Sequence, residues 1–210
     1  MTTIGRTIML DEYELTVHSL TLRQLGSAEQ LAEVNGLATA DVEAALEKAA
    51  ADGAVISRRG NAMITPAGRQ FLDEVYARAF ASVREDQDVS AAMDSFETGV
   101  NKQILSLTTD WQTVEVNGER VTNDHGDAEY DAKIIAKLGR VVDKTQKVLQ
   151  PLVNADPLVD RFLDRIGSAL TRAEGGETDY ISGVRVDSVH TVWFQMHEHI
   201  LRLTGRERPE

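Results

Sequence analysis

Hydrophobic positions recur at intervals of three and four residues along most of the chain, which predicts a mainly helical protein. The pattern is clearest over residues 186–203, where one helical face collects apolar and aromatic side chains together with two histidines. That face holds Val186, His190, Trp193, Phe194, His197, Ile200 and Leu201. Ser188 or Asp187 suits the start of this helix, and Arg202 and Gly205 suit its last turn and its end. Two titratable rings are therefore expected on a surface that a helix normally buries.

The first third of the chain has helical stripes followed by strand-like alternation. A capping box from Ser27 to Gln30 begins a short helix, Thr39 is expected to cap the next one, and Gly53 to stop it. Pro66 suits the first position of a later helix, where no amide hydrogen is needed. The predicted elements are helices at 13–25, 28–36 and 40–52, strands at 54–57 and 62–64 around the connection 58–61, and a helix from 66 to about 85.

This order, and the stretch D-G-A-V-I-S-R-R-G-N-A-M-I-T-P-A-G-R at 52–69, resemble the winged helix-turn-helix of MarR-like transcription regulators. In that family the third helix enters the major groove of DNA, and the hairpin touches the backbone or the minor groove. The resemblance implies a set of positions that would face DNA. These are Thr39, Ala40, Asp41, Glu43 and Ala44 on the helix, and Arg58 and Arg59 on the hairpin.

The charge of this region departs from the family pattern. The formal net charge of the chain is −12, and residues 27–53 hold six acidic residues against one basic residue, Lys48. The start of the third helix offers no Arg, Lys, Asn or Gln to read a base edge, and two arginines supply few phosphate contacts. Two interpretations stay open, a DNA reader and a packing or protein-docking module.

The rest of the chain predicts a helical bundle with one small hairpin. Ser90 is expected to cap a helix with the stripe Met93, Phe96, Val100, Ile104, Leu107 and Trp111. Strands at 113–116 and 119–122 flank Asn117-Gly118, a strong hairpin signal. A helix over 128–149 is expected to end at Pro151, and Asp156-Pro157 to open another over 158–174. The predicted fold class is mainly α, with a winged helix-turn-helix domain at 1–86 and an α-helical bundle at 87–210.

The two histidines of the last helix are the first candidates for chemistry. His190 and His197 lie roughly 10 Å apart along a helix axis, which is too far for one metal ion, so no metal site is predicted. They are either core histidines satisfied by hydrogen bonds, or part of a pocket in which a histidine accepts a proton. Asp124 and His125, which follow the second hairpin, are either turn residues or partners of those histidines.

A basic row is predicted on one face of the helix over 128–149. It consists of Lys133, Lys137, Arg140, Lys144 and Lys147, at spacings of 4, 3, 4 and 3. Such a row is either a solvated face or a docking surface for an acidic or phosphate-bearing partner.

Composition excludes several classes of function. The chain has no cysteine, and hence no disulfide framework, thiolate chemistry or classical zinc cluster. It carries no P-loop, no dinucleotide-binding glycine pattern, and no serine or cysteine nucleophile motif. No apolar run approaches the length of a membrane span, and the first ten residues do not resemble a signal peptide. We therefore expect a cytoplasmic protein with no membrane partner.

Four motifs of the C-terminal half resemble small helical proteins associated with dikinase-type phosphotransferases, relatives of phosphoenolpyruvate synthase. They are F-x-x-x-x-N at 96–101, D-W-Q at 110–112, N-D-H at 123–125 and V-D-S-V-H-T-V-W-F-Q-M-H-E at 186–198. In dikinases an ATP-grasp domain phosphorylates a histidine on a swivelling domain, which then visits a separate acceptor site. The resemblance, over about residues 90–206, implies an accessory or acceptor-binding subunit. It would bind no cofactor itself, and ATP and Mg would bind to a larger ATP-grasp and phosphohistidine partner.

The resemblance also implies roles for particular residues. The candidate catalytic residues are His190, His197, Asp124 and His125, with Asp124 or Glu198 orienting a histidine that accepts the proton of a hydroxyl substrate. Trp111, Trp193, Phe194, Asn101 and Glu198 would bind a small, possibly aromatic molecule such as a phenol. The basic row or the winged helix would dock the large subunit.

Two alternatives to the phosphotransferase subunit remain. One is a regulator whose helical C-terminal domain senses a small ligand or dimerises, while Thr39, Arg58 and Arg59 contact DNA. The other is an adaptor with no ligand. A homodimer is compatible with each of these interpretations.

Overall fold

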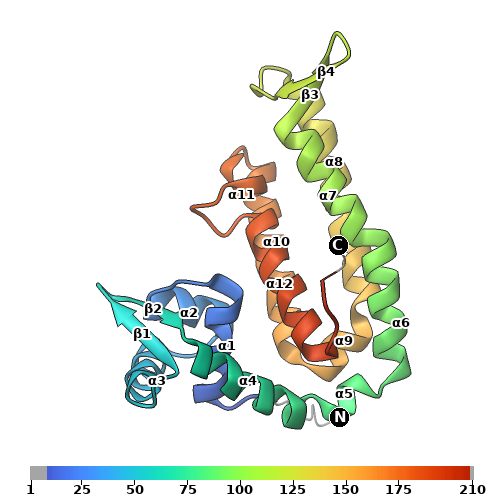
Figure 1. Cartoon of the computed structure of the whole chain (residues 1–210). Helices are drawn as coiled ribbons and strands as arrows, with labels where there is room; N and C mark the ends of the chain where they lie inside the picture. Colours follow the sequence, from blue (N-terminus) through green and yellow to red (C-terminus); the bar gives the residue numbers. More distant parts are fainter. Residues whose placement is uncertain (1–8, 209–210) are drawn as a thin grey trace, which may run out of the picture. The chain divides into compact units, whose positions relative to one another are not determined.

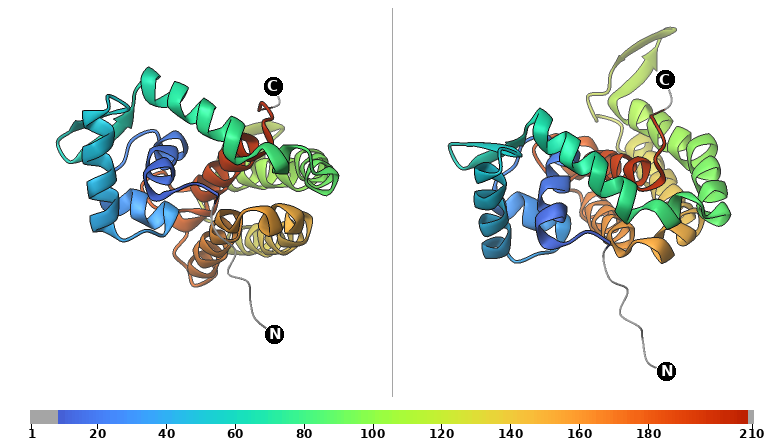
Figure 2. Two further views of the ribbon diagram at one scale, coloured as in Figure 1. Left: turned by 90° about the horizontal axis from the view of Figure 1, so that it is seen from below. Right: turned by 60° about the horizontal axis from the view of Figure 1, so that its bottom comes forward.

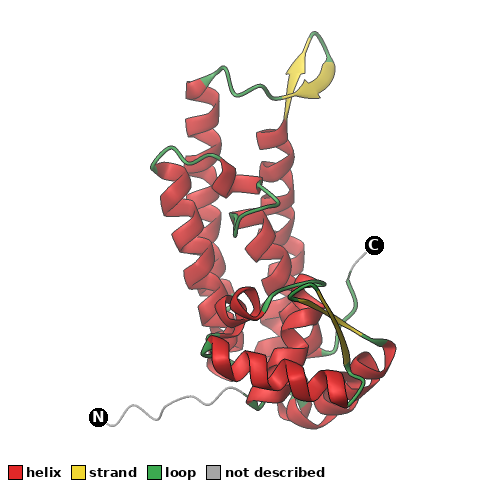
Figure 3. Ribbon diagram, turned by 90° about the vertical axis from the view of Figure 1, so that its left-hand side faces the viewer, coloured by secondary structure: helices red, strands yellow, loops and turns green. Residues whose placement is uncertain are grey.

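The computed structural model describes residues 9–208 and is mainly α-helical, with strands confined to two small antiparallel hairpins in that part of the chain (Figure 3). The described residues form two compact units. Unit 1 comprises 9–86, 155–159 and 195–208, and unit 2 comprises 87–154 and 160–194. Helices α10 (Pro157–Glu174) and α12 (Val189–Thr204) contribute residues to both units. The division into domains at residues 86 and 87 stays a prediction.

Unit 1 begins with helices whose ends are set by their capping residues. Its elements are α1 (Glu12–Arg23), α2 (Ala28–Asn35), α3 (Thr39–Ala51), β1 (Val55–Arg58), β2 (Asn61–Ile64), α4 (Pro66–Ala79) and α5 (Ala81–Arg84) (Figures 1 and 2). Capping boxes at Asp11 and Ser27 begin α1 and α2, and Gly36 ends α2 in the left-handed conformation. The prediction for Thr39 was wrong, because α3 already includes it and its N-cap, Ala38, offers no side-chain oxygen.

The β1–β2 hairpin has a shorter turn than predicted. Arg58 pairs with Asn61, so Arg59 and Gly60 alone connect the strands, with φ of 52° and 79°. Positive φ at both positions gives the turn that matches the twist of a hairpin. Gly26 forms a further antiparallel bridge with Ala62, through hydrogen bonds of 3.2 and 2.9 Å in the two directions.

The T-P-A-G-R segment fixes α4 against this hairpin. Thr65 Oγ1 accepts from the amide of Gly68 at 3.0 Å and donates to the carbonyl of Gly53 at 2.7 Å, while Pro66 occupies the first helical turn. A Cβ at Gly68 would lie 2.1 Å from the carbonyl oxygen of Ala54. Only glycine therefore permits this close approach of helix and strand.

Unit 2 contains two long helical segments joined by the second hairpin. Its elements are α6 (Gln87–Ser95), the π-helix η1 (Phe96–Asn101), α7 (Lys102–Gln112), β3 (Thr113–Val116), β4 (Glu119–Thr122), α8 (Ala128–Val148), most of α9 (Gln150–Ala155), most of α10, α11 (Asp179–Ser182) and the first turns of α12. Helices α7 and α8 run side by side, and the hairpin lies at their common end (Figures 1 and 3). All six residues of the stripe from Met93 to Trp111 are buried, as predicted.

In unit 2 the predicted cap Ser90 was wrong, and the predicted end of the helix over 128–149 was confirmed to within one residue. Helix α6 starts at Gln87, so Ser90 lies inside it and does not cap it. Helix α8 ends at Val148, and Pro151 lies in the first turn of α9. A proline at that position needs no amide hydrogen, so it fits the start of the new helix and does not terminate the old one. No helix between residues 9 and 208 is long and apolar enough to cross a lipid bilayer.

Candidate functional site

The helix that carries His190 and His197 starts at Val189, directly after Ser188, one of the two residues predicted for its start. Ser188 Oγ accepts from the amide of Thr191 at 3.2 Å and so serves as its cap. Asp187 instead pairs with Arg165, at 2.6 Å between Nη2 and Oδ2. Gly205, with φ of 69°, follows the last turn.

The structure places the two predicted histidines in different surroundings. His197 belongs to unit 1, is 3% exposed, and its Nδ1 lies 3.3 Å from Nη1 of Arg208. His190 belongs to unit 2 and is half-buried, and burial lowers the pKa of its ring. Glu198 is held by Arg202 at 2.6 Å and by Arg208 at 3.3 Å.

The aromatic residues predicted to bind one small molecule lie in different surroundings. Trp193 donates its indole N–H to Asn101 Oδ1 at 3.0 Å, and Asn101 Nδ2 donates to Glu97 at 2.9 Å. Phe96 stacks on Trp193, with 5.4 Å between the ring centres. The π-helix places both ends of the F-x-x-x-x-N motif against one tryptophan ring. Phe194, by contrast, is 41% exposed.

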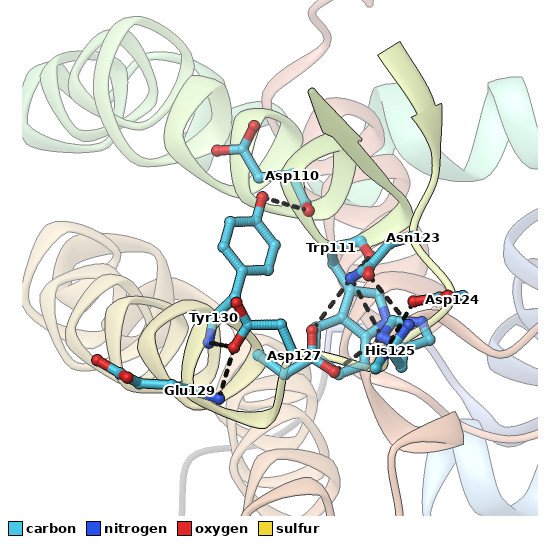
Figure 4. A network of polar contacts seen from close by, with 10 residues as sticks. Asp110, Trp111, Asn123, Asp124, His125, Asp127, Glu129 and Tyr130 are labelled. Atoms are coloured by element: carbon cyan, nitrogen blue, oxygen red, sulfur yellow. Dashed lines mark hydrogen bonds and ion pairs between the residues drawn. The ribbon is translucent and has the colours of Figure 1, made fainter. Parts of the chain in front are cut away.

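The N-D-H motif forms the most organised polar cluster of unit 2 (Figure 4). Asn123 is 7% exposed and donates from Nδ2 to the carbonyl of Trp111 and to Asp131 Oδ1, both at 3.0 Å. His125 Nδ1 lies 2.9 Å from Asp131 Oδ2, and the amide of His125 donates to Asn123 Oδ1 at 3.0 Å. The His125 ring packs on Trp111 at 4.4 Å between centres.

The geometry defines which nitrogen of His125 can act. A carboxylate accepts, so Asp131 fixes the proton of neutral His125 on Nδ1 and leaves the lone pair on Nε2. The His125 side chain is 38% exposed and that of Asp131 11%. The backbone of His125 has φ of 59°, in the left-handed region, and such conformations cluster at functional sites. An oriented, partly accessible proton acceptor results.

A pocket of about 530 Å³ adjoins this cluster at the base of the β3–β4 hairpin. It is lined by Asp110, Thr113, Val114, Glu115, Arg120, Asn123, Asp124, Asp127 and Tyr130. Tyr130 donates its hydroxyl to the carbonyl of Asp110 at 3.0 Å, and Arg120 pairs with the Asp110 side chain at 3.4 Å. Asp127 caps α8 through the amides of Glu129 and Tyr130. Four carboxylates face one guanidinium, so the pocket disfavours anions.

The structure brings together some of the predicted site residues and not others. Trp111, Asp124 and His125 lie at one place, with Asp124 accepting from the amide of Gly126 at 2.9 Å. His190 forms no hydrogen bond or ion pair with any described residue, so the structure shows no contact between it and His125. Asn123 and Asp131, which complete the cluster, were not predicted. Asn123 and Asp131 are eight residues apart in the sequence, and no local pattern predicts that they meet. The many polar residues at 123–127 did indicate a possible site there.

A second polar cluster, in the core of unit 1, was also missed. His18 Nδ1 lies 2.5 Å from the hydroxyl of Tyr76, and His18 Nε2 lies 3.0 Å from Nδ1 of His199. His199 Nε2 is 3.4 Å from Oδ2 of Asp156. Both rings are fully buried, and Asp156 is 1% exposed. Only the position of His18 between Leu15 and Leu22 on an apolar stripe could have indicated this cluster.

Other predicted surfaces are exposed. All five cations of the basic row are exposed on α8, and Lys133 pairs with Glu129 at 2.7 Å. Arg58 and Arg59 are exposed on the β1–β2 hairpin, and Thr39 is half-buried at the start of α3. Within residues 9–208, no three His, Cys, Asp or Glu side chains are grouped so that they could hold a metal ion. No known family, curated protein or solved structure matches this chain.

Proposed function

We propose that this chain is the acceptor-binding subunit of a dikinase-type phosphotransferase, and that His125 is its proton acceptor. One observation supports the proposal above the others. His125 is oriented by Asp131, packed on Trp111 and partly exposed. Its neighbours Asn123 and Asp124 line the 530 Å³ pocket. The geometry favours His125 over His197, because a ring that is 3% exposed leaves no room for a substrate.

The chemistry follows from the free lone pair of His125. The hydroxyl proton of the acceptor passes to Nε2, while the acceptor oxygen forms a bond to the phosphorus carried by the partner subunit. The P–N bond of the partner's phosphohistidine breaks, and its electron pair returns to that nitrogen. Asp131 stabilises the imidazolium that forms, as an acceptor for its Nδ1–H.

The lining of the pocket limits the class of acceptor. Asp110, Glu115, Asp124 and Asp127 outnumber Arg120, so a carboxylate or phosphate substrate would be repelled. Tyr130 offers aromatic surface to the pocket. The acceptor is therefore a neutral or cationic hydroxyl compound, for which phenol is the simplest aromatic probe.

In this proposal ATP and Mg²⁺ bind to the larger partner and none binds to this chain. The basic row on α8 is the docking surface, since its five exposed cations fall on one face of a helix in a chain of net charge −12. A subunit that depends on ATP chemistry in this way works in the cytoplasm.

The test is reconstituted phosphoryl transfer with the ATP-grasp protein that binds this chain in its host. Transfer of labelled phosphate from ATP to phenol, and to neutral hydroxyl compounds related to it, should fall by about 10²- to 10⁴-fold in His125→Gln. His190→Gln is the matched control and should retain activity. Circular dichroism checks that both variants remain folded. Full activity of His125→Gln, or its loss in His190→Gln alone, would move the site away from His125.

A second function is supported by the order of elements in unit 1. Three helices, a hairpin bridged through Gly26 and a following helix agree with a MarR-like winged helix-turn-helix, and Arg58 and Arg59 are exposed at the hairpin turn. The chain would then be a regulator whose pocket senses a small molecule. Retardation of the upstream DNA duplex at physiological salt, abolished in Arg58→Glu/Arg59→Glu, would support this function. Absence of retardation even at low salt would exclude it.

A further inference from the structure

An apolar row crosses the outer face of the β1–β2 hairpin. Gly26 pairs with Ala62, so the preceding residue, Leu25, lies opposite Met63, and Met63 pairs on its other side with Ile56. Leu25, Met63 and Ile56 are 50%, 54% and 61% exposed. Three large exposed apolar side chains side by side on one small sheet leave a surface that another surface would cover. We call these three residues the hairpin row.

The end of the hairpin next to this row is positively charged. Arg58 follows Ile56 by two residues on β1, so it shares the outer face of the sheet, and Arg59 lies in the turn. Both side chains are exposed, and within residues 9–208 neither forms an ion pair. The hairpin therefore presents apolar side chains beside two unpaired cations.

Helix α3 of the same unit presents the opposite pattern. At about 100° per residue, Ala40, Ala44 and Ala51 share one face with Glu43 and Glu47, and all five are exposed. Neither glutamate forms an ion pair with any of the described residues. We call this surface the α3 face. Its alanines are flat enough for large side chains to approach closely, and its two glutamates match two arginines in number and opposite sign.

We propose that a second copy of this chain covers the hairpin row, in a two-fold dimer. The hairpin row of one copy packs on the α3 face of the other, with Arg58 and Arg59 against Glu43 and Glu47, and the same contacts recur in the reverse direction. Both complementary surfaces belong to one unit of one chain, which is what a two-fold interface requires. This association goes beyond the proposed phosphotransfer and uses none of the residues of the pocket in unit 2.

Charge distinguishes this occupant from nucleic acid. A duplex on the same surfaces would place phosphates against Glu43 and Glu47 and would desolvate the hairpin row without covering it with apolar groups. A second copy would pair the arginines with glutamates and would cover the hairpin row with alanine side chains. The interaction should therefore be weakened by salt and also by a polar substitution in the row.

The mass of the full chain in solution, measured by sedimentation velocity over a range of concentrations at low and high salt, tests the proposal. The unmodified chain should dimerise with increasing concentration, more strongly at low salt. Ile56→Ser/Met63→Ser should be monomeric. Arg58→Glu/Arg59→Glu and Glu43→Arg/Glu47→Arg should each raise the dimer Kd by at least about tenfold, because like charges then meet.

An equimolar mixture of the two charge-reversed variants gives the decisive result. In a mixed dimer the glutamates of one hairpin meet the arginines of the other α3 face, while the unmodified hairpin and helix meet as before. The mixture should therefore dimerise although each variant alone does not. Arg69→Glu/Lys102→Glu, which changes the net charge equally at exposed positions elsewhere, is the matched control and should dimerise normally.

Several results would overturn the proposal. They are a monomer at every concentration, a dimer that ignores both charge reversals, a mixture that stays monomeric, and a monomer whose Arg58 and Arg59 are needed for DNA retardation. Circular dichroism of each variant separates loss of association from loss of folding. Because the pocket is not involved, phosphoryl transfer in the His125→Gln experiment can fail or succeed independently.

Discussion

The buried histidines of unit 1 form a chain of polar contacts that runs from Tyr76 to Asp156. Burial raises the pKa of Tyr76, so its hydroxyl stays protonated and can donate to His18 Nδ1. His18 then carries its proton on Nε2 and donates to His199 Nδ1, which leaves the Nε2–H of His199 directed at Asp156. Burial opposes ionisation of Asp156, but His199 and the amide of Leu158 outweigh it, and the pKa of this carboxyl is lowered. The ring of His18, whose pKa is lowered, is thus neutral, and the carboxylate of Asp156 is charged.

Stability should therefore fall in mild acid. Burial and the neighbouring His199 hold the pKa of His18 well below its usual value. Just below about pH 6.5 the unfolded chain therefore binds a proton that the folded chain does not. The free energy of unfolding should decrease by up to about 1.4 kcal/mol per pH unit as the pH falls through that range. Burial lowers the pKa of His190 in the same direction. Urea titrations between about pH 7.5 and about pH 5.5 measure this dependence.

Replacement of His18 separates this effect from general acid sensitivity. His18→Gln should lose about 1–3 kcal/mol at neutral pH, because His199 is left with an unsatisfied buried nitrogen. Its stability should then decrease less steeply with acid than that of the unmodified chain. Gln103→Leu, at an exposed side chain that does not titrate, should keep the original slope. Equal slopes in all three proteins would show that His18 does not control the pH dependence.

At this scale the sequence indicates single residues but not their partners. His18 and His199 are 181 positions apart, so no local pattern could pair them. The residue Asp156 was predicted as a helix cap, and its Oδ1 does accept from the amide of Leu158 at 2.9 Å. Its second oxygen faces His199, and only the tertiary packing of unit 1 could show that.

The π-helix η1 determines where the two ends of the F-x-x-x-x-N motif point. The hydrogen bonds of a π-helix span five residues instead of four, which changes the direction in which the following side chains point, and π-helices often occur at functional sites. Here Phe96 and Asn101 both contact Trp193, by ring stacking and by a hydrogen bond. The motif therefore fixes α7 to the start of α12 within unit 2.

Asn101→Leu should remove this link. The substitution leaves the indole N–H of Trp193 without its acceptor, at a cost of about 1–3 kcal/mol in the free energy of unfolding. The indole resonance of Trp193 in nitrogen-edited NMR spectra should shift, and its hydrogen should exchange with solvent faster. The same change at exposed Gln103, two residues further on, is the control. An unchanged indole signal in Asn101→Leu would contradict the role given to Asn101.

Most helices and strands could be predicted from local sequence signals, and the errors in their predicted ends also have local causes. The capping box at Ser27 and the Asn117-Gly118 turn each satisfy backbone groups or dihedral angles without help from the rest of the chain. Ser90 has the right residue type for a cap, but α6 had already begun at Gln87. The π-helix gives no signal in a pattern of period 3.6, because the buried stripe continues through it.

Unit 1 includes residues from the C-terminal half of the chain, namely the start of α10 and most of α12. Residues 195–208 cluster with 9–86, and Met196, Ile200 and Leu203 of this segment are fully buried. Each contributes about 1.5–3 kcal/mol by burial. Together this is about 4.5–9 kcal/mol, comparable with the lower part of the roughly 5–15 kcal/mol that is typical of a whole domain. The predicted domain at 1–86 would be short of this much stability on its own.

A fragment of residues 1–86 should therefore not form a stable fold. We expect a poorly dispersed amide NMR spectrum and a broad thermal transition, in contrast to the full chain. The mildly truncated chain 1–205, which keeps all of α12, should behave like the full protein. A cooperative transition in the 1–86 fragment would show instead that the N-terminal segment is an independent domain.

The pairing of His18 with His199 also sets an order of events in the cell. The ribosome must have synthesised the chain to about residue 204, and released that stretch from its exit tunnel, before the first helix can meet its last neighbour. Until then His18, which is fully buried in the finished molecule, lacks the partner that its Nε2 contacts. The N-terminal segment must therefore wait through most of translation in an incomplete state, and chaperones that shield apolar surface have that whole interval in which to act on it.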